Sequence, residues 1–503
     1  MREAHRTKPS RALMSATTEV DGTTTLLTPM NESNKIPSDA GRSWWLREAL
    51  AAESGEPCPA LAADTTADVA ILGGGYTGMW TAFHLKQLQP DLDIVLVEQD
   101  ICGGGPSGRN GGFVNSWWSG VTELARRLGD GPALALCRAG EESVGAIGRF
   151  CDEHGVDAWF QPDGDMGVAS SPGQVGEWGD LIMTADRLGV GDDFKVLSPA
   201  ELRERVDSPV LHGGISSGYG ATVQPARLAR GLRRVLLERG IRVYEQTPAT
   251  RFGVGDPVVV ETPGGRVRAG AAVIGLNAWA VHWKAFRRLL TVRGSYIVLT
   301  EPAPEKLEEI NWTDFSGLWD FRSALHYVRT TPDGRIAFGI GGVQPGMFRQ
   351  IGPRFAWDEH AVRIAVEDLH RMFPTFAEVP IEAGWGGPID VSGQHWPFFG
   401  TMGKAANVHY GLGYTGNGVA PAHLGGRVLA HKALGNLDPV LELPIVDMEP
   451  KRFPPEPIRS PGAWIANTAI QHKDATEDEG EEANPFVDFV AKLPRRLGYN
   501  LGP

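Results

Sequence analysis

A glycine-rich turn between an apolar strand and a helix constrains the fold of this chain more than any other feature. Residues 68–72 have the length and composition of a buried strand, and three glycines stop them. Residues 76–89 then carry apolar side chains at helical spacing, and residues 93–98 form a second apolar strand. Strand, turn, helix and strand predict a βαβ unit with a right-handed crossover.

Gly73, Gly75 and Gly78 have the spacing of a dinucleotide-binding turn. The first glycine permits the tight turn, the second lets the backbone approach a pyrophosphate, and the third lets the helix pack closely on the strand. Glu98 ends the second strand, where an acid accepts hydrogen bonds from an adenosine ribose and repels a 2′-phosphate. We therefore expect a site for a dinucleotide other than NADP.

The glycine spacing alone is weak evidence, because it recurs from Gly103 and from Gly411. Only the first occurrence follows a buried strand, opens a helix and is answered by an acid at the end of the next strand. A glycine turn in an unrelated α/β protein is the alternative. The segment 105–112, rich in glycine and backbone donors, either belongs to the same site or is a flexible surface loop.

Charge and cysteine content exclude several classes of function. With 61 acidic and 48 basic residues the net charge is −13, which argues against a nucleic-acid or anionic-membrane partner. The four cysteines include no CxxC pair, which argues against a zinc ribbon or disulfide scaffold and indicates a reducing compartment. No apolar run approaches the roughly 20 residues that span a bilayer, and residues 1–40 lack the apolar core of a signal peptide. We expect a cytoplasmic protein without a metal site.

Three runs of sequence resemble the D-amino-acid oxidase superfamily of FAD enzymes. They are ADVAILGGGYTGMWTAFHL from residue 67, VEQDICGGGPSGRNGGF from residue 97 and GLGYTGNGVAPAHLGGRVLA from residue 411. Within this superfamily the chain is most similar to the γ-glutamylputrescine oxidoreductases and related bacterial amine oxidases. The resemblance covers residues 43–440, and three motifs in the right order and spacing are far more specific than one glycine turn.

The resemblance implies an α/β (α+β overall) fold with two domains. A Rossmann-like FAD-binding domain would be built from the discontinuous segments 43–120, 200–290 and 385–445. A substrate domain with a large mixed or antiparallel sheet would be built from residues 121–199 and 291–384. We expect a disordered tail over residues 1–42 and an irregular C-terminal extension over residues 446–503, with a solvated acidic stretch at 474–482.

Periodicity and turn residues predict further elements along the chain. The expected helices are residues 121–154, 175–190, 228–240, 358–372 and 418–434. The expected strands are residues 241–244, the hairpin 258–260 and 266–268, the returning strand 272–276, and the second-sheet strands 292–300 and 325–343.

The resemblance also implies one FAD. We expect it to be bound non-covalently, because all four cysteines precede residue 152 whereas some relatives attach FAD to a cysteine in the substrate half. The residues expected to hold the cofactor are Gly73, Gly75, Tyr76, Thr77, Gly78 and Glu98 at the ADP half, Ser107, Gly108, Arg109, Asn110, Gly111 and Gly112 along the pyrophosphate and isoalloxazine, Asn277 after a strand, and Gly413, Tyr414, Thr415, Gly416, Asn417 and Gly418 before the last helix. The N-terminus of that helix would stabilise negative charge on the reduced flavin.

The chemistry implied by the resemblance is hydride transfer from a substrate carbon to flavin N5, followed by hydrolysis of the imine to a carbonyl compound. The expected substrate is a small amine or amino acid, and the electron acceptor is oxygen or another oxidant. Oxidation of a hydroxy compound, or a flavin-binding subunit that only shuttles electrons, are the alternatives. The sequence leaves the oligomeric state open.

Residues 324–330 resemble the strand that faces the flavin in relatives. Period-two alternation places His326 on one face and Tyr327 with Arg329 on the other. We expect these three side chains to serve catalysis or substrate binding, with Arg329 receiving a substrate carboxylate through its planar fork. An ion pair between Arg329 and an acid at the domain interface is the alternative.

Two other groups of side chains are candidates for the substrate pocket. His395 lies in the loop before Pro397 and is either a catalytic residue or a hydrogen-bonded loop histidine. Trp117 and Trp118 follow the glycine-rich segment 105–112 and are placed to wall an apolar, cation-accepting site. Ordinary core packing is the alternative for both tryptophans.

Overall fold

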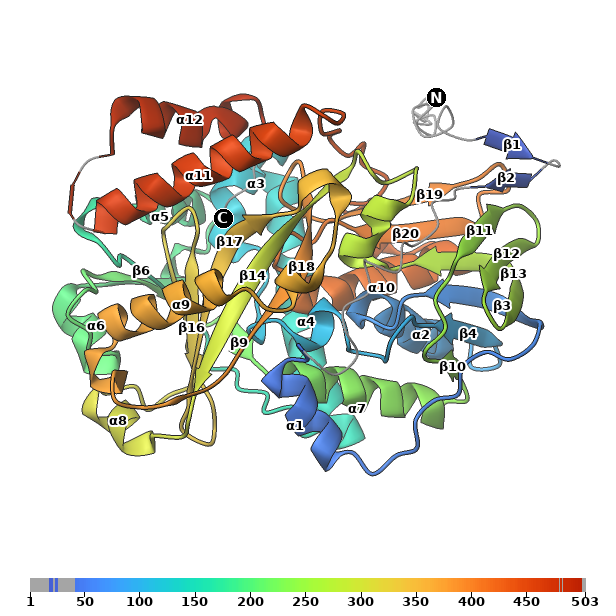
Figure 1. Cartoon of the computed structure of the whole chain (residues 1–503), viewed down its shortest axis with the longest axis horizontal. Helices are drawn as coiled ribbons and strands as arrows, with labels where there is room; N and C mark the ends of the chain where they lie inside the picture. Colours follow the sequence, from blue (N-terminus) through green and yellow to red (C-terminus); the bar gives the residue numbers. More distant parts are fainter. Residues whose placement is uncertain (1–17, 21–22, 26–40, 479, 482, 500–503) are drawn as a thin grey trace.

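Two β-sheets, each covered by helices, organise the chain (Figure 1). The computed structural model describes residues 18–20, 23–25, 41–478, 480–481 and 483–499. Sheets of mixed orientation combined with helices confirm the predicted fold class. The α-helices are α1 Trp44–Ala52, α2 Tyr76–Leu88, α3 Val121–Leu128, α4 Asp130–His154, α5 Gly179–Arg187, α6 Pro199–Arg205, α7 Pro225–Glu238, α8 Pro304–Glu309, α9 Glu359–Met372, α10 Val419–Leu434, α11 Arg459–Asp478 and α12 Pro485–Arg496.

The first sheet, on the right in Figure 1, is built around a parallel core. Its order is β1-β2-β11-β12-β13-β3-β4-β10, and β20 pairs with β13 and with β19. Strands β10, β4, β3, β13 and β20 run parallel, so their carboxyl ends meet at one edge. The strands are β1 Thr18–Val20, β2 Thr23–Thr25, β3 Thr65–Leu72, β4 Ile94–Val97, β10 Arg242–Tyr244, β11 Arg251–Val254, β12 Val258–Thr262, β13 Gly265–Ile274, β19 Phe398–Met402 and β20 Val408–Leu412.

The predicted βαβ unit is confirmed, since β3 and β4 pair in parallel and α2 connects them. Helix α2 is buried along most of its length because β3 and α10 enclose it. Its approach to α10 is close: a Cβ on Gly426 of α10 would lie 2.5 Å from the Cβ of Trp80. Glycine therefore sets the distance between these two helices, as it does between helix and strand at the turn.

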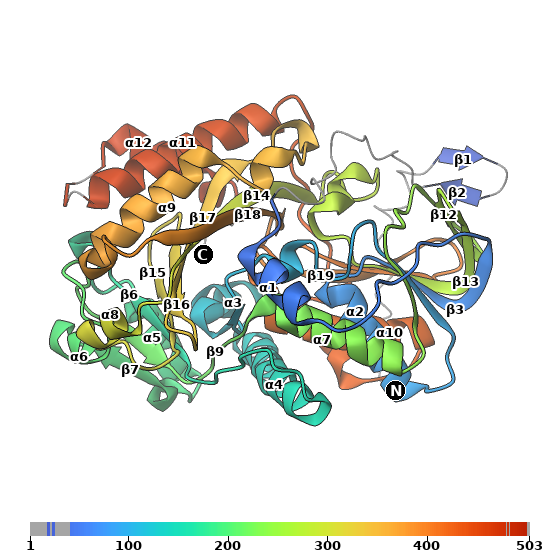
Figure 2. The same ribbon diagram turned by 60° about the horizontal axis from the view of Figure 1, so that its bottom comes forward.

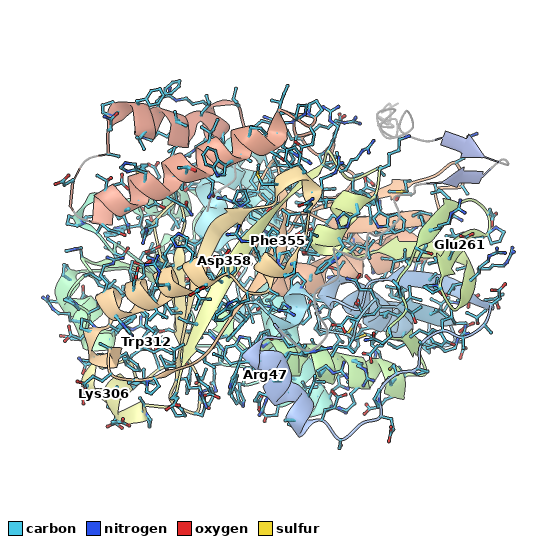
Figure 3. All side chains as sticks on the ribbon, in the orientation of Figure 1. Arg47, Glu261, Lys306, Trp312, Phe355 and Asp358 are labelled. Carbon is cyan, nitrogen blue, oxygen red and sulfur yellow. The ribbon has the colours of Figure 1, made fainter. Side chains whose placement is uncertain are left out.

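The second sheet is mostly antiparallel and has the order β18-β14-β17-β16-β15-β6-β8-β7, with β6 and β15 parallel. Its outer face packs on α9 and on aromatic side chains such as Trp312 (labelled in Figure 3). The ring centroids of Trp312 and Phe373 are 5.6 Å apart. Its inner face is turned toward α1 and the first sheet (Figure 2). The strands are β6 Asp165–Val168, β7 Phe194–Leu197, β8 Gly214–Ser217, β14 Leu290–Thr300, β15 Gly317–Asp320, β16 His326–Thr330, β17 Ile336–Pro345 and β18 Ile381–Ser392.

Most predicted elements are confirmed with boundaries shifted by a few residues. The helical regions became α3, α4, α5, α7, α9 and α10, and the predicted hairpin is β12 with β13. The returning strand 272–276 is the second half of β13, which pairs with β3. One segment lies elsewhere: β8, which falls inside the stretch 200–290 assigned to the first domain, pairs with β6 and β7 in the second sheet.

The expectation of an irregular C-terminal extension is wrong, because α11 and α12 occupy it. The acidic stretch is not fully solvated either: Asp474 is 1% exposed and accepts a hydrogen bond from the backbone N–H of Ala324 at 2.8 Å. Asp478 pairs with Arg322 at 2.9 Å. The acidic residues that suggested a solvated tail instead form contacts that hold α11 against the second sheet.

The predicted disorder of residues 1–42 falls mostly outside the described residues. Among the described ones, β1 and β2 form an antiparallel pair that extends the first sheet beside β11, which the prediction missed. In the described ranges we find no helix with the length and apolar character needed to cross a membrane.

Candidate active site

A cavity of about 630 Å³ opens where the carboxyl ends of β3, β4 and β13 meet the N-termini of α2 and α10. This is the edge of a parallel sheet at which ligands of such folds bind. The volume lies within the range of about 300–1,000 Å³ that is typical of small-molecule and cofactor sites. The predicted cofactor residues that line it are Gly73, Gly75, Tyr76, Thr77, Glu98, Ser107, Asn110, Asn277, Tyr414, Gly416 and Gly418.

The glycine turn has the steric roles expected from its spacing. Gly73 has φ +108°, and a Cβ on it would lie 2.5 Å from the carbonyl oxygen of Gly275. A Cβ on Gly78, which does not line the cavity, would collide with the carbonyl oxygen of Gly73. Gly75 borders the cavity, where a side chain would meet the hydroxyl of Ser107 at 3.1 Å.

Two helix N-termini face this one cavity. The N-cap of α2 is Gly75 and the N-cap of α10 is Gly418, and neither helix has a side-chain cap. The first N–H groups of a helix lack internal partners and sum to a partial positive charge. The cavity therefore suits a ligand with negative charge at two separate points, as a pyrophosphate-linked flavin has when reduced.

Glu98 lies at the end of β4 on the wall of the cavity, as expected for an acid that binds ribose. Its carboxylate accepts hydrogen bonds from the backbone N–H groups of Gly74 at 2.7 Å and Asp100 at 2.9 Å. Burial raises the pKa of Glu98 to about 7, although these two hydrogen bonds act in the opposite direction. The carboxylate is thus held in a fixed position by the turn itself.

Some residues of the segment 105–112 line the cavity, and others pack against the neighbouring backbone and hold the segment in place. The hydroxyl of Ser107 accepts from the backbone N–H of Tyr76 at 2.9 Å, and the side chain of Asn110 accepts from the N–H of Gly112 at 2.8 Å. Gly108 allows close approach, since a Cβ there would collide with the carbonyl oxygen of Gly103. The segment is held to the end of α2 and is not a loose surface loop.

Arg109 does not line the cavity, contrary to prediction. It is 3% exposed and donates to the carbonyl oxygens of Gly104 at 3.0 Å and Gly386 at 3.3 Å. Burial lowers its pKa to about 10. Arg109 therefore ties the glycine-rich segment to β18. It holds the segment in place and makes no contact with the cavity, where a ligand contact was expected.

Gly111 and Gly112 mark the place where the second sheet reaches the cofactor side. A Cβ on Gly111 would lie 2.7 Å from the ring of Tyr327, and Gly112 has φ +81°, where an added Cβ would collide with the carbonyl oxygen of Val223. Neither glycine lines the cavity of the first sheet. Only residues without a side chain allow β16 to approach the segment 105–112 so closely.

Asp390, near the end of β18, is a residue of this site that the sequence did not reveal. It is fully buried, and its carboxylate accepts from the backbone N–H groups of Gly413 at 2.5 Å and Tyr414 at 3.2 Å and from the side-chain amide of Asn277 at 2.9 Å. Burial raises its pKa to about 7 against the effect of these hydrogen bonds. Asp390 therefore links the second sheet to the loop before α10. Its only signal in the sequence was a lone acid near the end of an apolar strand.

The loop 413–418 is fixed from both sides. The hydroxyl of Tyr414 accepts from Thr77 at 2.9 Å, which connects the loop to α2. Thr415 has φ +54° and accepts from the backbone N–H of Ser392 at 3.1 Å, while the Asn417 amide donates to the carbonyl of Ser116 at 3.0 Å. Gly413, Thr415 and Asn417 thus shape the loop, whereas Tyr414, Gly416 and Gly418 line the cavity.

Tyr327 lies on the inner face of the second sheet, as predicted. Its hydroxyl is 2.7 Å from that of Ser295 on β14, and its ring packs on Gly111. Burial raises the pKa of Tyr327 to about 12, so the phenol stays protonated and can donate a hydrogen bond. Tyr327 and Ser295 form a polar pair directly beside the glycine-rich segment.

His326 is on the outer face and takes no part in this site. Its Nδ1 is 2.7 Å from Asp320 and its Nε2 is 3.0 Å from Asp368 of α9, and the ring is 1% exposed. Burial alone lowers its pKa, but these carboxylates outweigh burial and the net shift is upward. The prediction of a catalytic role is therefore corrected: the alternation was right, and the face of His326 is the one that α9 covers.

Arg329 shares the face of Tyr327 but is sealed beneath α1. Its guanidinium lies 5.3 Å from the ring centroid of Trp45, and the residue is 1% exposed. Burial lowers its pKa to about 9. This burial argues against the predicted carboxylate site, and in the described part of the chain no ion pair of Arg329 is found; the cation stacks on an indole.

Arg293 on β14 is an arginine that sequence reasoning did not single out. It is paired across the sheet with Ile389, which lines the cavity, so the two residues share the inner face. Its guanidinium donates to the carbonyl of Gly342 at 2.9 Å and to the side chain of Asn467 on α11 at 2.6 Å. Arg293 as a whole is half-buried, although burial of its guanidinium lowers its pKa to about 10, whereas Arg329 is closed off.

His395 lies in the turn between β18 and β19 with φ +81° and does not line the cavity. A catalytic role for His395 therefore stays a prediction. All four cysteines are described, and none of them lines the cavity. Non-covalent attachment of the cofactor accordingly stays our prediction.

The amino-acid sequence of this chain is similar to those of several known oxidoreductases. The chain is 29% identical over 395 residues to gamma-glutamylputrescine oxidoreductase of Escherichia coli K12, covering 78% of this chain and 89% of that protein. It is 29% identical over 411 residues to a probable oxidoreductase, OrdL, of Rhizobium meliloti, covering 79% and 90%. Human mitochondrial sarcosine dehydrogenase is 24% identical over 388 residues, which are 73% of this chain and 39% of that one.

Solved structures share the fold. Glycine oxidase from Geobacillus kaustophilus superimposes with a TM-score of 0.61 at 19% identity, covering 74% of this chain and 96% of its own. L-proline dehydrogenase from P. horikoshii gives a TM-score of 0.58 at 18% identity, with coverage of 77% and 97%. The model of the family described as DAO, FAD dependent oxidoreductase, matches residues 68–432. The chain therefore belongs to the DAO family of FAD-dependent oxidoreductases.

Proposed function

We propose that this protein oxidises a carbon–nitrogen bond of a small amine or amino acid, with FAD bound non-covalently across the large cavity. The observation that carries the proposal is the position of the Tyr327–Ser295 pair on the inner face of the second sheet, against Gly111 of the cofactor segment. Relatives named for amine and amino-acid oxidation support the same class of substrate.

Each end of the cavity has a separate task in this proposal. The N-terminus of α2 would bind the pyrophosphate, and Glu98 would accept hydrogen bonds from the ribose. The N-terminus of α10 would stabilise negative charge on the flavin, and Asp390 keeps the loop before this helix in place. Bound FAD supplies the acceptor for the two electrons that leave the substrate.

The inner face of the second sheet orients the substrate. The protonated phenol of Tyr327 and the hydroxyl of Ser295 offer hydrogen bonds to a polar substrate group. Arg293, half-buried on the same face, is our candidate for binding a substrate carboxylate in place of Arg329. Orientation rather than a strong base is what the protein contributes to such chemistry.

The test is the visible spectrum of the purified protein followed by anaerobic addition of primary amines, secondary amines and amino acids in separate pools. We expect flavin bands that bleach with at least one pool. Flavin that bleaches only with hydroxy compounds would replace the amine by an alcohol, and flavin that no pool bleaches would indicate an electron-transfer role. Reoxidation under air then decides between oxygen and another electron acceptor.

We keep the cytoplasm as the predicted location. The support is the composition, with four unpaired cysteines and an acidic charge balance. A small-molecule substrate and an electron acceptor are the partners that this activity requires.

A further inference from the structure

The inner face of the second sheet continues beyond Tyr327 to a second, smaller cavity. Trp319 on β15 is the cross-strand partner of Tyr327, and Gly167 on β6 is the partner of Trp319. Asp165 lies two residues before Gly167 and therefore on the same face. Because neighbouring strands are about 4.8 Å apart, β6 lies about 10 Å from β16.

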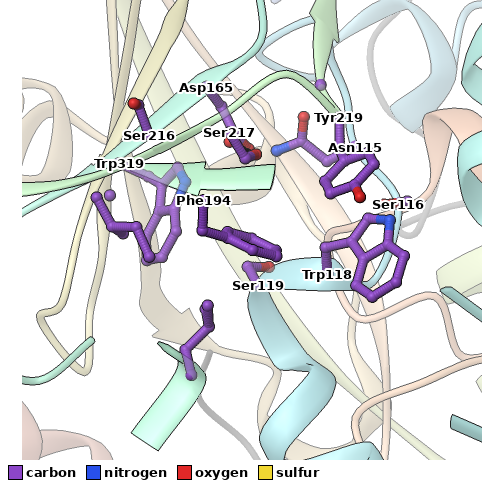
Figure 4. A pocket seen from close by; sticks show the side chains of 14 residues that line it. Asn115, Ser116, Trp118, Ser119, Asp165, Phe194, Ser216, Ser217, Tyr219 and Trp319 are labelled. Carbon is purple, nitrogen blue, oxygen red and sulfur yellow. Dashed lines mark hydrogen bonds between the residues drawn. The ribbon is translucent and has the colours of Figure 1, made fainter. Parts of the chain in front are cut away.

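This second cavity, which we call the Asp165 pocket, has aromatic walls (Figure 4). Trp118 and Tyr219 are stacked with ring centroids 4.8 Å apart, and Phe194 and Trp319 complete the walls. Its volume is about 20 Å³. A site needs about 10–15 Å³ to hold one water molecule, so the Asp165 pocket accepts one group of that size. Of the two tryptophans singled out from the sequence, Trp118 does wall a pocket.

Two oxygen acceptors converge on the Asp165 pocket. The carboxylate of Asp165 receives a hydrogen bond from Ser217 at 2.9 Å, and the carboxamide oxygen of Asn115 is buried without a hydrogen-bond partner among the described residues. Gly220 lies between them, since a Cβ on it would be 2.9 Å from that oxygen of Asn115 and 3.4 Å from the Cβ of Asp165. The pocket thus holds one acceptor, the Asn115 oxygen, that requires a donor, beside a carboxylate that already accepts from Ser217 and Trp319.

The charges around the pocket leave Asp165 uncompensated. Among the described residues no cation acts on its pKa: burial raises the pKa of Asp165 to about 6, and only hydrogen bonds from Ser217 and Trp319 act in the opposite direction. Arg138 stacks on Trp118 at 5.1 Å but is ion-paired with Glu141 at 2.8 Å. Asp193, another nearby acid, accepts from the hydroxyl of Tyr219. A cation entering the pocket would therefore meet a carboxylate, an amide oxygen and aromatic faces.

We propose that the Asp165 pocket binds a protonated primary amino group at the end of the substrate remote from the bond that is oxidised. The inference rests on the proposed function and narrows its substrate to an elongated diamine or polyamine. A primary ammonium group is about the size of water, donates three hydrogen bonds and is attracted to aromatic faces. The net charge of −13 also favours the approach of a polycation.

The kinetic test compares straight-chain α,ω-diamines with monoamines of the same length, using anaerobic flavin reduction by the holoenzyme. We expect a preference for diamines at one optimal length. Asp165→Asn keeps the shape of the side chain and should raise KM for that diamine at least tenfold, with kcat and the monoamine kinetics unchanged. Asp192→Asn, an equal change of charge at an exposed site nearby, should leave both series unchanged.

A binding measurement separates recognition from turnover. Calorimetric titration of the anaerobically reduced holoenzyme, which cannot oxidise the ligand, should show tighter binding of the diamine than of the monoamine. Asp165→Asn should remove this difference, and so should Asn115→Ala, which serves if the first variant does not fold. Binding of the diamine to the wild-type protein should also weaken as the pH falls through about 6, because protonation of Asp165 removes the negative charge.

Equal diamine-to-monoamine ratios in the wild-type protein and both variants would overturn the inference while leaving amine oxidation intact. Failure of every amine to bleach the flavin would instead overturn the proposed function on which it rests. The two failures are therefore distinguishable in a single series of measurements.

Discussion

The cofactor cavity and the inner face of the second sheet meet between Gly111 and Tyr327, but the chain builds them in different ways. Around the cavity the contacts come from helix N-termini, glycine turns and backbone N–H groups. On the inner face they come from side chains on strands that are distant in sequence, such as Ser295 and Tyr327. The geometry of a site built from backbone groups depends on the positions of the glycines. The geometry of a site built from side chains depends on which strands pair in the sheet.

The largest expected effect is on the backbone side. Gly78→Val should yield protein without FAD, because a side chain there collides with the carbonyl of Gly73 and moves α2 away from the phosphate site. The flavin-to-protein absorbance ratio after purification measures this. Gly131→Ala in α4 is the matched control, since nothing lies within 4 Å of an added Cβ, and it should keep its FAD. Full flavin content in Gly78→Val would contradict the assignment of the turn.

The next effect tests the connection between the two sides. Asp390→Leu removes the acceptor for the N–H groups of Gly413 and Tyr414 and the amide of Asn277, and each buried unpaired donor costs about 1–3 kcal/mol. We expect at least tenfold weaker FAD binding, measured by fluorescence titration of the apoprotein. Asp390→Asn, which keeps one oxygen acceptor, should lie between the variant and the wild-type protein. Unchanged affinity in both would mean that the loop holds its shape without Asp390.

The sequence predicted the cofactor cavity well because the cavity is built from backbone groups at glycine turns and helix N-termini. Glycine spacing, strand and helix periodicity and the strand-terminal Glu98 are local signals, and they located the cavity and part of its lining, while the family resemblance added Asn277 and the loop before α10. Asp390 escaped because its partners at Gly413 and Tyr414 become visible only when β18 and the α10 loop are placed together. Nothing in the local sequence distinguishes it from any acid that ends a strand.

The side-chain face was predicted only in part. Alternation correctly separated His326 from Tyr327, but it could not say that α9 covers one face or that Trp45 seals Arg329 on the other. Helix α11 was missed because the polar residues that it buries disguise an amphipathic pattern. Local sequence patterns do not predict buried polar contacts between segments that are distant in the sequence.

Two arginines on the inner face sharpen the comparison. If a carboxylate-bearing substrate is used, Arg293→Gln should raise its KM about tenfold, on the scale of about 1–3 kcal/mol for hydrogen bonds to charged groups, and leave simple amines unchanged. Arg329→Gln should show no such selectivity, because Arg329 is 1% exposed beneath Trp45. KM values for paired amino acids and amines measure the difference. Selective loss in Arg329→Gln alone would restore the original prediction.

The smallest effect on turnover is expected at His326, on the outer face. His326→Gln leaves the buried carboxylate of Asp320 without its partner and should lower the free energy of unfolding by about 3 kcal/mol, with kcat/KM unchanged. His360→Gln, at an exposed histidine of α9, is the matched control and should alter neither quantity.

The pH dependence identifies the cause of that loss. The pKa of His326 is raised above its ordinary 6.5 in the folded state, because Asp320 and Asp368 outweigh the effect of burial. Its contribution to stability is therefore fully present below pH 6.5 and is lost as the pH rises through the folded-state pKa. Urea midpoints of the wild-type protein should fall over that interval, and those of His326→Gln should fall less. If the fall in midpoint is the same in both proteins, another group is responsible, and His326 adds packing to the second sheet without contributing charge.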